Sequence, residues 1–331
     1  MKELKEHIKS KMFSKCYLLY GDESFLKKTY EKRIKNAIIP EEAEAMNYNY
    51  LEGKGVEVSK VIDYAETLPF LNDKRLVFIK DSGLFQSGKN NDSEKLSEFI
   101  ESIPESTCIV FSEDSVDKRG KLYKAVNKYG YAVEFKTPNE KELVNWIARD
   151  LNKNGIKVSS SVAVYFIRTV GADMEAISSE LEKIAAYKEF NGQLTNEDID
   201  AVCIKSLETK IFDLVGAIGN KKPEVALTIY NNLIMLKESP LMVLAMISRQ
   251  LRLILQCKSL SSEGKTNSQI AQILGIRDFV VRECLVQGKN FNEVMLKNAI
   301  AKCLETDINI KIGKVNQETG VELLIILFAG K

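Results

Sequence analysis

The segment GDESFLKKT, which begins at Gly21, is the part of the sequence closest to a chemical motif. A phosphate-binding loop has the pattern GxxxxGK[ST], in which backbone N–H groups surround the phosphates and the lysine contacts the terminal ones. Gly21 fits the first glycine, but Leu26 stands where the second glycine belongs. A side chain there obstructs the close approach of the backbone to a phosphate, so the sequence predicts no ATP-binding loop.

The charges around this segment support the same conclusion. Asp22 and Glu23 lie at the start of an expected helix, where carboxylates satisfy the helix dipole and repel a phosphate. Lys27 and Lys28 are then interpreted as solvated helix residues.

A buried strand ending in an Asp-Glu pair would be a second sign of nucleotide chemistry, because such a pair holds magnesium and activates a water. The strand RLVFIKD instead ends in Lys80 and Asp81. A lone Asp after a buried strand is typical of a turn. The acidic run Glu41, Glu42 and Glu44 is typical of a solvated loop. No catalytic residue is therefore predicted.

The cysteines and the single histidine offer little metal or nucleophile chemistry. The cysteines are Cys16, Cys108, Cys203, Cys257, Cys284 and Cys303. They form no CxxC pair, so a zinc site would have few ligands. Their apolar neighbours predict buried free thiols. His7 is expected to be a solvated surface residue, which disfavours triad chemistry. We expect no metal and no cofactor.

Length and composition indicate a globular protein of several domains. A chain of 331 residues exceeds one ordinary core, so two or three domains are expected. Hydrophobic residues make up 45% and charged residues 28%, which excludes a disordered or membrane protein. No stretch is expected to be long and apolar enough to span a bilayer, and the N-terminus predicts no secretory signal. A cytoplasmic location without membrane contact is expected.

The net charge of +1 conceals a mild asymmetry. Residues 209–331 hold 16 Lys and Arg against 11 Asp and Glu, whereas residues 1–208 hold 31 against 35. This surplus is far below the dense basic stripe of a protein that binds DNA alone. Any contact with DNA is therefore expected to be auxiliary or shared with partners.

Residues 1–138 alternate between short strand patterns and helical patterns, which predicts an α/β domain with a parallel sheet. The expected helices run from 24 to 37 and from about 58 to 68, where Pro69 stops the second one. The expected strands are 16–20, 75–81, 107–114 and 131–135.

From residue 140 onward the patterns are helical only. Residues 139–208 predict a small helical domain with helices at about 160–170 and 173–188 and a shorter one beginning at Thr195. Residues 209–331 predict an all-helical domain of longer amphipathic helices.

Six landmarks in order resemble the DNA polymerase III delta subunit family over essentially the whole chain. They are LLYGDESFL, TLPFLNDKRLVFI, VGADMEAISSELEKIAAY, ISRQLRLIL, LGIRDFVVRE and LETDINIKIG. The resemblance implies an AAA+-like first domain without a working nucleotide site, then a helical lid and a helical collar. Where an active lid often carries an arginine, this chain has Met174 nearby.

The resemblance also implies partners and a task. Such a subunit sits in a five-membered clamp-loader ring beside ATP-hydrolysing subunits and the delta-prime subunit. It binds the beta sliding clamp and opens it for loading onto primed DNA, without catalysis of its own. An ATP-hydrolysing clamp-loader subunit is one alternative. It would need a lysine flanked by a glycine and a Ser or Thr, and a strand that ends in an Asp-Glu pair, and this sequence has neither. By the same resemblance, a motor or delta-prime subunit is expected to have a zinc-binding cysteine cluster, which this sequence lacks. A general helical or AAA+-like scaffold is another alternative.

By this resemblance, the family's clamp-binding element falls in the stretch from Thr67 to Arg75, where the candidate contact residues are Leu68, Pro69, Phe70 and Leu71. Two large apolar residues beside a proline can fill a pocket of a partner. Judged from the residues alone, Phe70 and Leu71 would more often pack under the domain's own helix. The resemblance favours clamp contact instead, while Leu68 is expected in the core.

Basic residues near the third strand are candidates for contact with DNA phosphates. They are Lys118, Arg119 and Lys121, in a loop around a glycine. A solvated loop is the alternative.

Two charged sets in the C-terminal domain are candidates for the contact between subunits. Arg249 and Arg252 lie three residues apart on one expected helix. Asp307 and Lys311 have i, i+4 spacing, so they can pair with each other or order the contact. A scaffold role is the interpretation for both sets.

Overall fold

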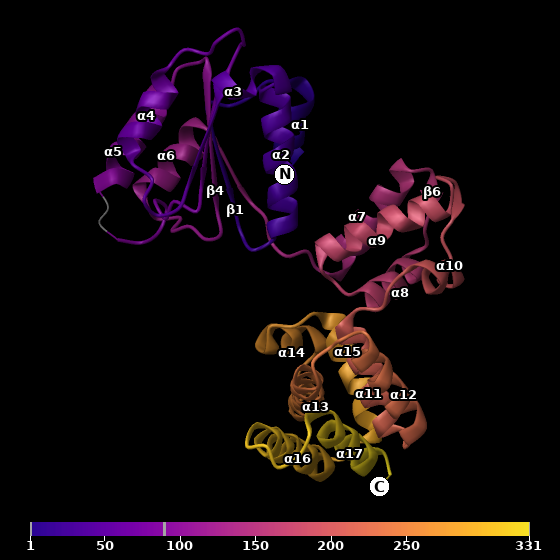
Figure 1. Ribbon diagram of the computed structural model, residues 1–331. Helices are drawn as coiled ribbons and strands as arrows, with labels where there is room; N and C mark the ends of the chain where they lie inside the picture. The colour runs from indigo at the N-terminus through magenta and orange to yellow at the C-terminus, as the bar shows by residue number, and fades with distance from the viewer. Residues whose placement is uncertain (1, 89–90, 331) are drawn as a thin grey trace. The chain divides into compact units, whose positions relative to one another are not determined.

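The structure is a computed structural model that describes residues 2–88 and 91–330 (Figure 1). The chain divides into two compact units, residues 1–138 and 139–331. Each unit is described separately below. The further boundary that the sequence predicts at residue 208 lies inside the second unit and stays a prediction.

Within the described residues, five strands of the first unit form one sheet in which every pair is parallel, in the order β2-β3-β4-β1-β5. The strands are β1 (Cys16–Tyr20), β2 (Tyr48–Glu52), β3 (Arg75–Lys80), β4 (Thr107–Glu113) and β5 (Tyr131–Glu134). The predicted parallel sheet is thus confirmed. The edge strand β2 escaped the sequence analysis, because its side chains are half-buried or exposed and its pattern is not apolar.

Helices cover both faces of this sheet (Figure 1). They are α1 (Lys2–Ser10), α2 (Ser24–Ile38), α3 (Glu44–Asn47), α4 (Val58–Glu66), α5 (Asn91–Ser102) and α6 (Lys121–Tyr129). Tyr17 and Leu19 of β1 pack with α1 and α2, whereas Leu18 packs with α4, α5 and α6. This alternation follows from the two-residue period of a strand. The acidic run expected as a loop forms the 3-10 turn Glu41–Ala43 and the start of α3.

Two expectations about single side chains were wrong in this unit and the next. His7 is half-buried rather than solvated, because its Nδ1 lies 2.9 Å from the hydroxyl of Tyr17 and its ring packs edge-on against Tyr17 and Tyr131. All six cysteines are free thiols, but Cys203 is only half-buried, at the end of a short helix.

In residues 139–330, the second unit is helical apart from one short parallel pair, β6 (Ile156–Lys157) with β7 (Gly192–Gln193), which the sequence analysis did not predict. Its first helices are α7 (Glu140–Lys153), α8 (Ser160–Val170), α9 (Met174–Tyr187) and α10 (Asn196–Val202). Thr195 is the N-cap of α10: its hydroxyl accepts from the Asp198 N–H, and the Asp198 carboxylate accepts from the Thr195 N–H.

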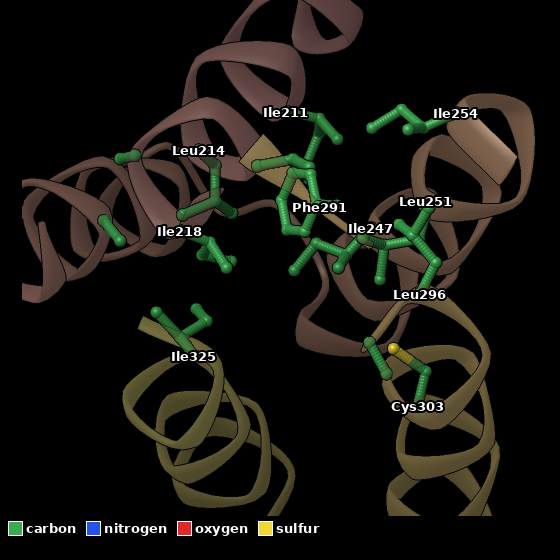
Figure 2. Close-up of a cluster of buried hydrophobic side chains, with 14 of the residues drawn as sticks. Ile211, Leu214, Ile218, Ile247, Leu251, Ile254, Phe291, Leu296, Cys303 and Ile325 are labelled. Atoms are coloured by element: carbon green, nitrogen blue, oxygen red, sulfur yellow. The ribbon is translucent and has the colours of Figure 1, made fainter. Parts of the chain in front are cut away.

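The remaining helices of the second unit pack around one large core. They are α11 (Leu207–Gly219), α12 (Pro223–Met235), α13 (Pro240–Ser262), α14 (Asn267–Leu274), α15 (Asp278–Gln287), α16 (Glu293–Lys311) and α17 (Gln317–Ala329), with a 3-10 turn at Gly288–Asn290. Figure 2 shows side chains of α11, α13, α16 and α17 directed toward one another, with Phe291 among them.

The helix α13 corrects one expectation from the sequence. Among the described residues it is the one helix long and apolar enough, by length and composition, to cross a membrane. Its buried side chains, which include Val243, Ile247, Leu251 and Ile254, belong to the core of the helical unit. A central helix of a globular unit has this same composition, because it is covered on several sides.

Three strand ends meet at Gly21. The Gly21 N–H donates to the Glu113 carbonyl at 3.3 Å, and the Phe135 N–H donates to the Tyr20 carbonyl at 2.6 Å. Gly21 has a φ of +123°, and a Cβ there would lie 2.2 Å from the Phe135 carbonyl oxygen. A glycine is therefore required by the packing of the strand ends themselves.

Replacing Gly21 with alanine is expected to destabilise the first unit by about 3 kcal/mol, because the new Cβ clashes with backbone and the φ is unfavourable. Thermal unfolding should show a melting temperature lower by about 10 °C. Gly55→Ala is the matched control, since a Cβ on Gly55 would meet no atom within 4 Å and the φ of Gly55 is not positive. Equal melting temperatures for the two variants would contradict this account.

Candidate functional site

The carboxyl edge of the sheet, where a parallel α/β protein would bind a phosphate, is occupied by the chain's own groups. The Gly21 N–H donates to Glu113, and the Glu23 N–H donates to the Phe135 carbonyl at 3.1 Å. The Glu23 carboxylate caps α2 by accepting from the Phe25 N–H at 3.3 Å. Three N–H groups of this segment, which a phosphate loop would offer to its ligand, are thus already used within the protein.

Lys27 fills the middle of this edge, contrary to the expectation that it is solvated. Its side chain is buried, with 3% of the residue exposed, whereas Lys28 is exposed as expected. The Lys27 ammonium donates to the Gly21 carbonyl at 3.2 Å, to the Glu113 carbonyl at 3.0 Å and to Asp114 Oδ1 at 2.6 Å. All three of its protons therefore have acceptors within the protein.

Two acidic residues, Asp81 and Glu113, lie at the ends of neighbouring strands at this edge. Asp81 follows β3 with a φ of +49°, in the turn conformation expected for a lone Asp. The buried carboxylate of Glu113, at the end of β4, accepts from the Ser82 hydroxyl at 2.5 Å and from the Ser82 N–H at 3.0 Å. Burial raises the pKa of Glu113, while its hydrogen bonds with Ser82 and Gly83 oppose that shift. In the described part of the chain, no three His, Cys, Asp or Glu side chains form a group that could hold a metal.

At the amino edge of the sheet, a loop between α4 and β3 exposes large apolar side chains. We name Leu68, Pro69, Phe70 and Leu71 the apolar loop. The exposed fractions are 76% for Leu68, 58% for Phe70 and 90% for Leu71. The expectation that Leu68 lies in the core was wrong, because α4 ends at Glu66, two residues earlier than predicted.

The backbone of the apolar loop is strained at its tip. Leu71 has a φ of +49°, in the left-handed region that a residue with a large side chain seldom adopts. Such strain persists only where the surroundings impose it, and it is enriched at functional sites. Beneath the loop lie two buried polar residues that the sequence analysis missed, Asn47 and Arg75. Only the fold reveals them, since Asn47 contacts Phe70 across 23 residues of sequence.

The three basic candidates for DNA contact each have a carboxylate partner. Lys118 lies 2.9 Å from Glu134, and this hydrogen bond raises the pKa of Lys118. Arg119 makes two hydrogen bonds with Asp117, at 2.9 and 3.0 Å. Lys121 lies 3.1 Å from Glu94. These pairs are exposed and weak, so a phosphate can compete for the lysines at small cost.

The charged candidates of the helical unit lie on exposed surfaces of α13 and α16. Arg249 pairs with Glu208 at 3.3 Å, whereas Arg252 is exposed with no ion pair within the described ranges. Asp307 and Lys311 pair at 2.8 Å, as their i, i+4 spacing allowed. Met174 is buried at the start of α9.

Exposed apolar side chains accompany these charges on α16 and α17. We name this set the collar stripe: Leu304, Ile308 and Ile312 at four-residue spacing, and Leu323, Ile326 and Leu327 on α17. The two helices pack against each other. Six exposed large apolar residues on one helix pair exceed what scattered surface residues explain.

A three-layer unit with strand order β2-β3-β4-β1-β5, followed by a mostly helical unit, defines an AAA+-like architecture. Residues 17–136 match the family described as DNA polymerase III, delta subunit. Residues 208–328 match the C-terminal domain of the DNA polymerase III delta subunit. The chain belongs to the DNA polymerase III delta subunit family, and it is therefore an accessory, clamp-loader subunit of that polymerase.

Two relatives agree with this assignment. The DNA polymerase III subunit delta of Bacillus subtilis (strain 168) is 27% identical over 317 residues, which cover 94% of this chain and 91% of that protein. The solved structure of the Bacillus subtilis DNA clamp loader delta protein aligns with a TM-score of 0.77 and 26% identity, and covers 100% of this chain and 99% of that one.

The purified chain is expected to show no saturable binding of ATP at micromolar concentrations in isothermal titration calorimetry, because Lys27 and the strand ends use the groups that a nucleotide needs. Lys27→Ala should not restore binding. It should lower the stability by about 1–3 kcal/mol, since two buried carbonyls lose a donor. The exposed Lys28→Ala is the control and should melt like the wild type. Saturable ATP binding by the wild-type chain would refute this interpretation.

Proposed function

We propose that this chain is a non-catalytic clamp-loader subunit that binds the beta sliding clamp through the apolar loop and opens it for loading onto primed DNA. The observation that carries the proposal is the exposure of Phe70 and Leu71 on a backbone that is strained and held from below. A protein gains no stability from two such side chains in water. Their exposure is accounted for by a partner that covers them.

The energy available from the apolar loop suits a recognition element. Burial of a large apolar side chain contributes on the order of 2 kcal/mol, and contacts of this kind at the centre of an interface dominate binding. Phe70 and Leu71 are adjacent, and both side chains are exposed. Together they can fill an apolar pocket on the clamp.

The occupied carboxyl edge supports a division of labour with other subunits. Since Lys27 and the backbone use the donors and acceptors there, the energy of ATP would enter through partner subunits that hydrolyse it. The alternative of an ATP-hydrolysing subunit has no observation in its favour. No observation favours a general scaffold either, because a scaffold would not need Phe70 and Leu71 to be exposed.

Assembly with the ATPase subunits and delta-prime is proposed for the helical unit. The collar stripe and the charged residues Arg249, Arg252, Asp307 and Lys311 give it an amphipathic surface, as contacts between subunits have. Lys118, Arg119 and Lys121 are proposed as auxiliary contacts to the DNA in the assembled complex. A cytoplasmic location fits this role, and no cofactor is required.

The double variant Phe70→Ala/Leu71→Ala is expected to bind the beta sliding clamp a hundred-fold to a thousand-fold more weakly, because two contacts of about 2 kcal/mol each are lost. Its melting temperature should stay within a few degrees of the wild type, since both side chains are exposed. Surface plasmon resonance and thermal unfolding measure the two quantities.

Leu71→Asn separates recognition from stability in the same loop. Asn tolerates a positive φ better than Leu, so this variant should melt at the wild-type temperature or above it while it loses clamp affinity. A double alanine variant that melts far below the wild type, yet binds the clamp with unchanged affinity, would show that the loop is structural.

The collar stripe yields a second test of the proposal. Leu304→Glu/Ile308→Glu is expected to reduce incorporation into the clamp-loader ring at least tenfold in reconstitution by gel filtration, because two carboxylates would be buried in an apolar contact. Helical content and clamp affinity should not change, since both residues are exposed and lie in the other unit from the apolar loop.

Lys297→Ala is the matched control on the same helix. It breaks an exposed i, i+4 pair with Glu293 that contributes about 0.3 kcal/mol, and it should assemble normally. Normal assembly of the double glutamate variant would exclude the collar stripe as the contact.

A further inference from the structure

Asn47 lies beneath the apolar loop and pairs with its backbone. The residue is fully buried, with 0% exposed, and it ends α3. Its Oδ1 accepts from the Phe70 N–H at 2.7 Å, and its Nδ2 donates to the Phe70 carbonyl at 2.9 Å. One side-chain amide thus satisfies both polar backbone groups of Phe70, as a hydrogen-bonded pair in an antiparallel ladder would.

Arg75 holds the other end of the same loop. With 7% of the residue exposed, its guanidinium donates to Asn49 Oδ1 at 2.8 Å, to the Met46 carbonyl at 2.9 Å and, more weakly, to the Leu68 carbonyl at 3.4 Å. Its Nε is buried without a hydrogen-bond partner, and no carboxylate pairs with Arg75 within residues 2–88 and 91–330. A buried guanidinium with an unsatisfied Nε and no carboxylate partner lowers the stability of the fold, so a compensating role is expected for Arg75.

The two residues act on a loop that would otherwise close on itself. An unrestrained segment with three large apolar side chains lowers its free energy by turning them away from water. Here the backbone is fixed at Phe70 and at Leu68, while the side chains on either side remain exposed and Leu71 keeps a positive φ. The hydrogen bonds from below therefore oppose the collapse of the loop.

We propose that Asn47, supported by Arg75, is the positioning residue that holds Phe70 and Leu71 ready for the clamp before it arrives. The inference rests on the proposed function of the apolar loop. Its physical basis is that a loop ordered in advance loses less conformational entropy on binding. If one residue of the loop were freed, ordering it again on binding would weaken affinity about tenfold.

Hydrogen exchange of the wild-type chain, followed by NMR, tests the proposal without a variant. The Phe70 amide should exchange much more slowly than the Leu71 amide, although both side chains are exposed, because only the Phe70 N–H is donated to a buried acceptor. The amide of Val77 in β3 serves as the internal reference for the sheet. Equal, fast exchange at Phe70 and Leu71 would overturn the inference.

The variant Asn47→Ala provides the functional test. It should accelerate exchange at the Phe70 amide, leave the Val77 amide unchanged and weaken binding of the beta sliding clamp about tenfold. Val126→Ala, which removes buried methyl groups from α6, is the control: it should lower the melting temperature but bind the clamp as the wild type does.

A double-mutant cycle distinguishes positioning from a general loss of stability. In the Phe70→Ala/Leu71→Ala background the side chains to be positioned are gone, so adding Asn47→Ala should change clamp affinity less than twofold. A further tenfold loss in that background would mean that Asn47 acts by another route and would overturn the inference.

Failure of this inference is separable from failure of the proposed function. If Phe70→Ala/Leu71→Ala loses clamp binding while Asn47→Ala binds as the wild type does, positioning by Asn47 is wrong and recognition by the loop stands. If the wild-type chain itself does not bind the clamp, the proposed function fails, and the inference that rests on it is overturned as well.

Discussion

The close approach of three strand ends around Gly21 is the constraint on which the first unit depends. Their polar groups must find partners at an edge where many parallel α/β proteins place a phosphate. In this chain the partners are internal, since the Gly21 and Glu23 amides donate to neighbouring strands and the Lys27 ammonium fills the space between Gly21 and Glu113. The polar groups at this edge are therefore satisfied within the first unit.

The two edges of this sheet differ in the groups that they present. The carboxyl edge is occupied by internal hydrogen bonds, whereas the amino edge, just before β3, presents the apolar loop. Because the sheet between them is held by apolar packing on both faces, the loop projects from a rigid support. The buried polar residues Asn47 and Arg75 then set the backbone of the loop directly.

The helical unit follows a different principle. Its core forms from many helices, with α13 at the centre and Phe291 among the side chains of its neighbours (Figure 2). Leu304 and Ile308 of α16 lie outside this core and are exposed. Exposed large apolar side chains are thus found on both units, in the apolar loop and in the collar stripe.

Local patterns in the sequence were enough to predict most of the helices and strands and to show that the phosphate-binding motif is absent from the sequence. Continuous apolar runs predicted β1, β3, β4 and β5, and the helical spacing after residue 140 predicted most of the second unit, because these signals depend on neighbours in the chain. The burial of individual polar residues and the conformation of the apolar loop were decided only by the tertiary structure. Lys27 is buried by acceptors 86 and 87 residues away, and Phe70 is held by Asn47 across 23 residues. The sequence analysis missed three features for the same reason: the edge strand β2, the exposure of Leu68 and the packing of His7. Each depends on which distant segment lies beside the residue, and no local pattern encodes that.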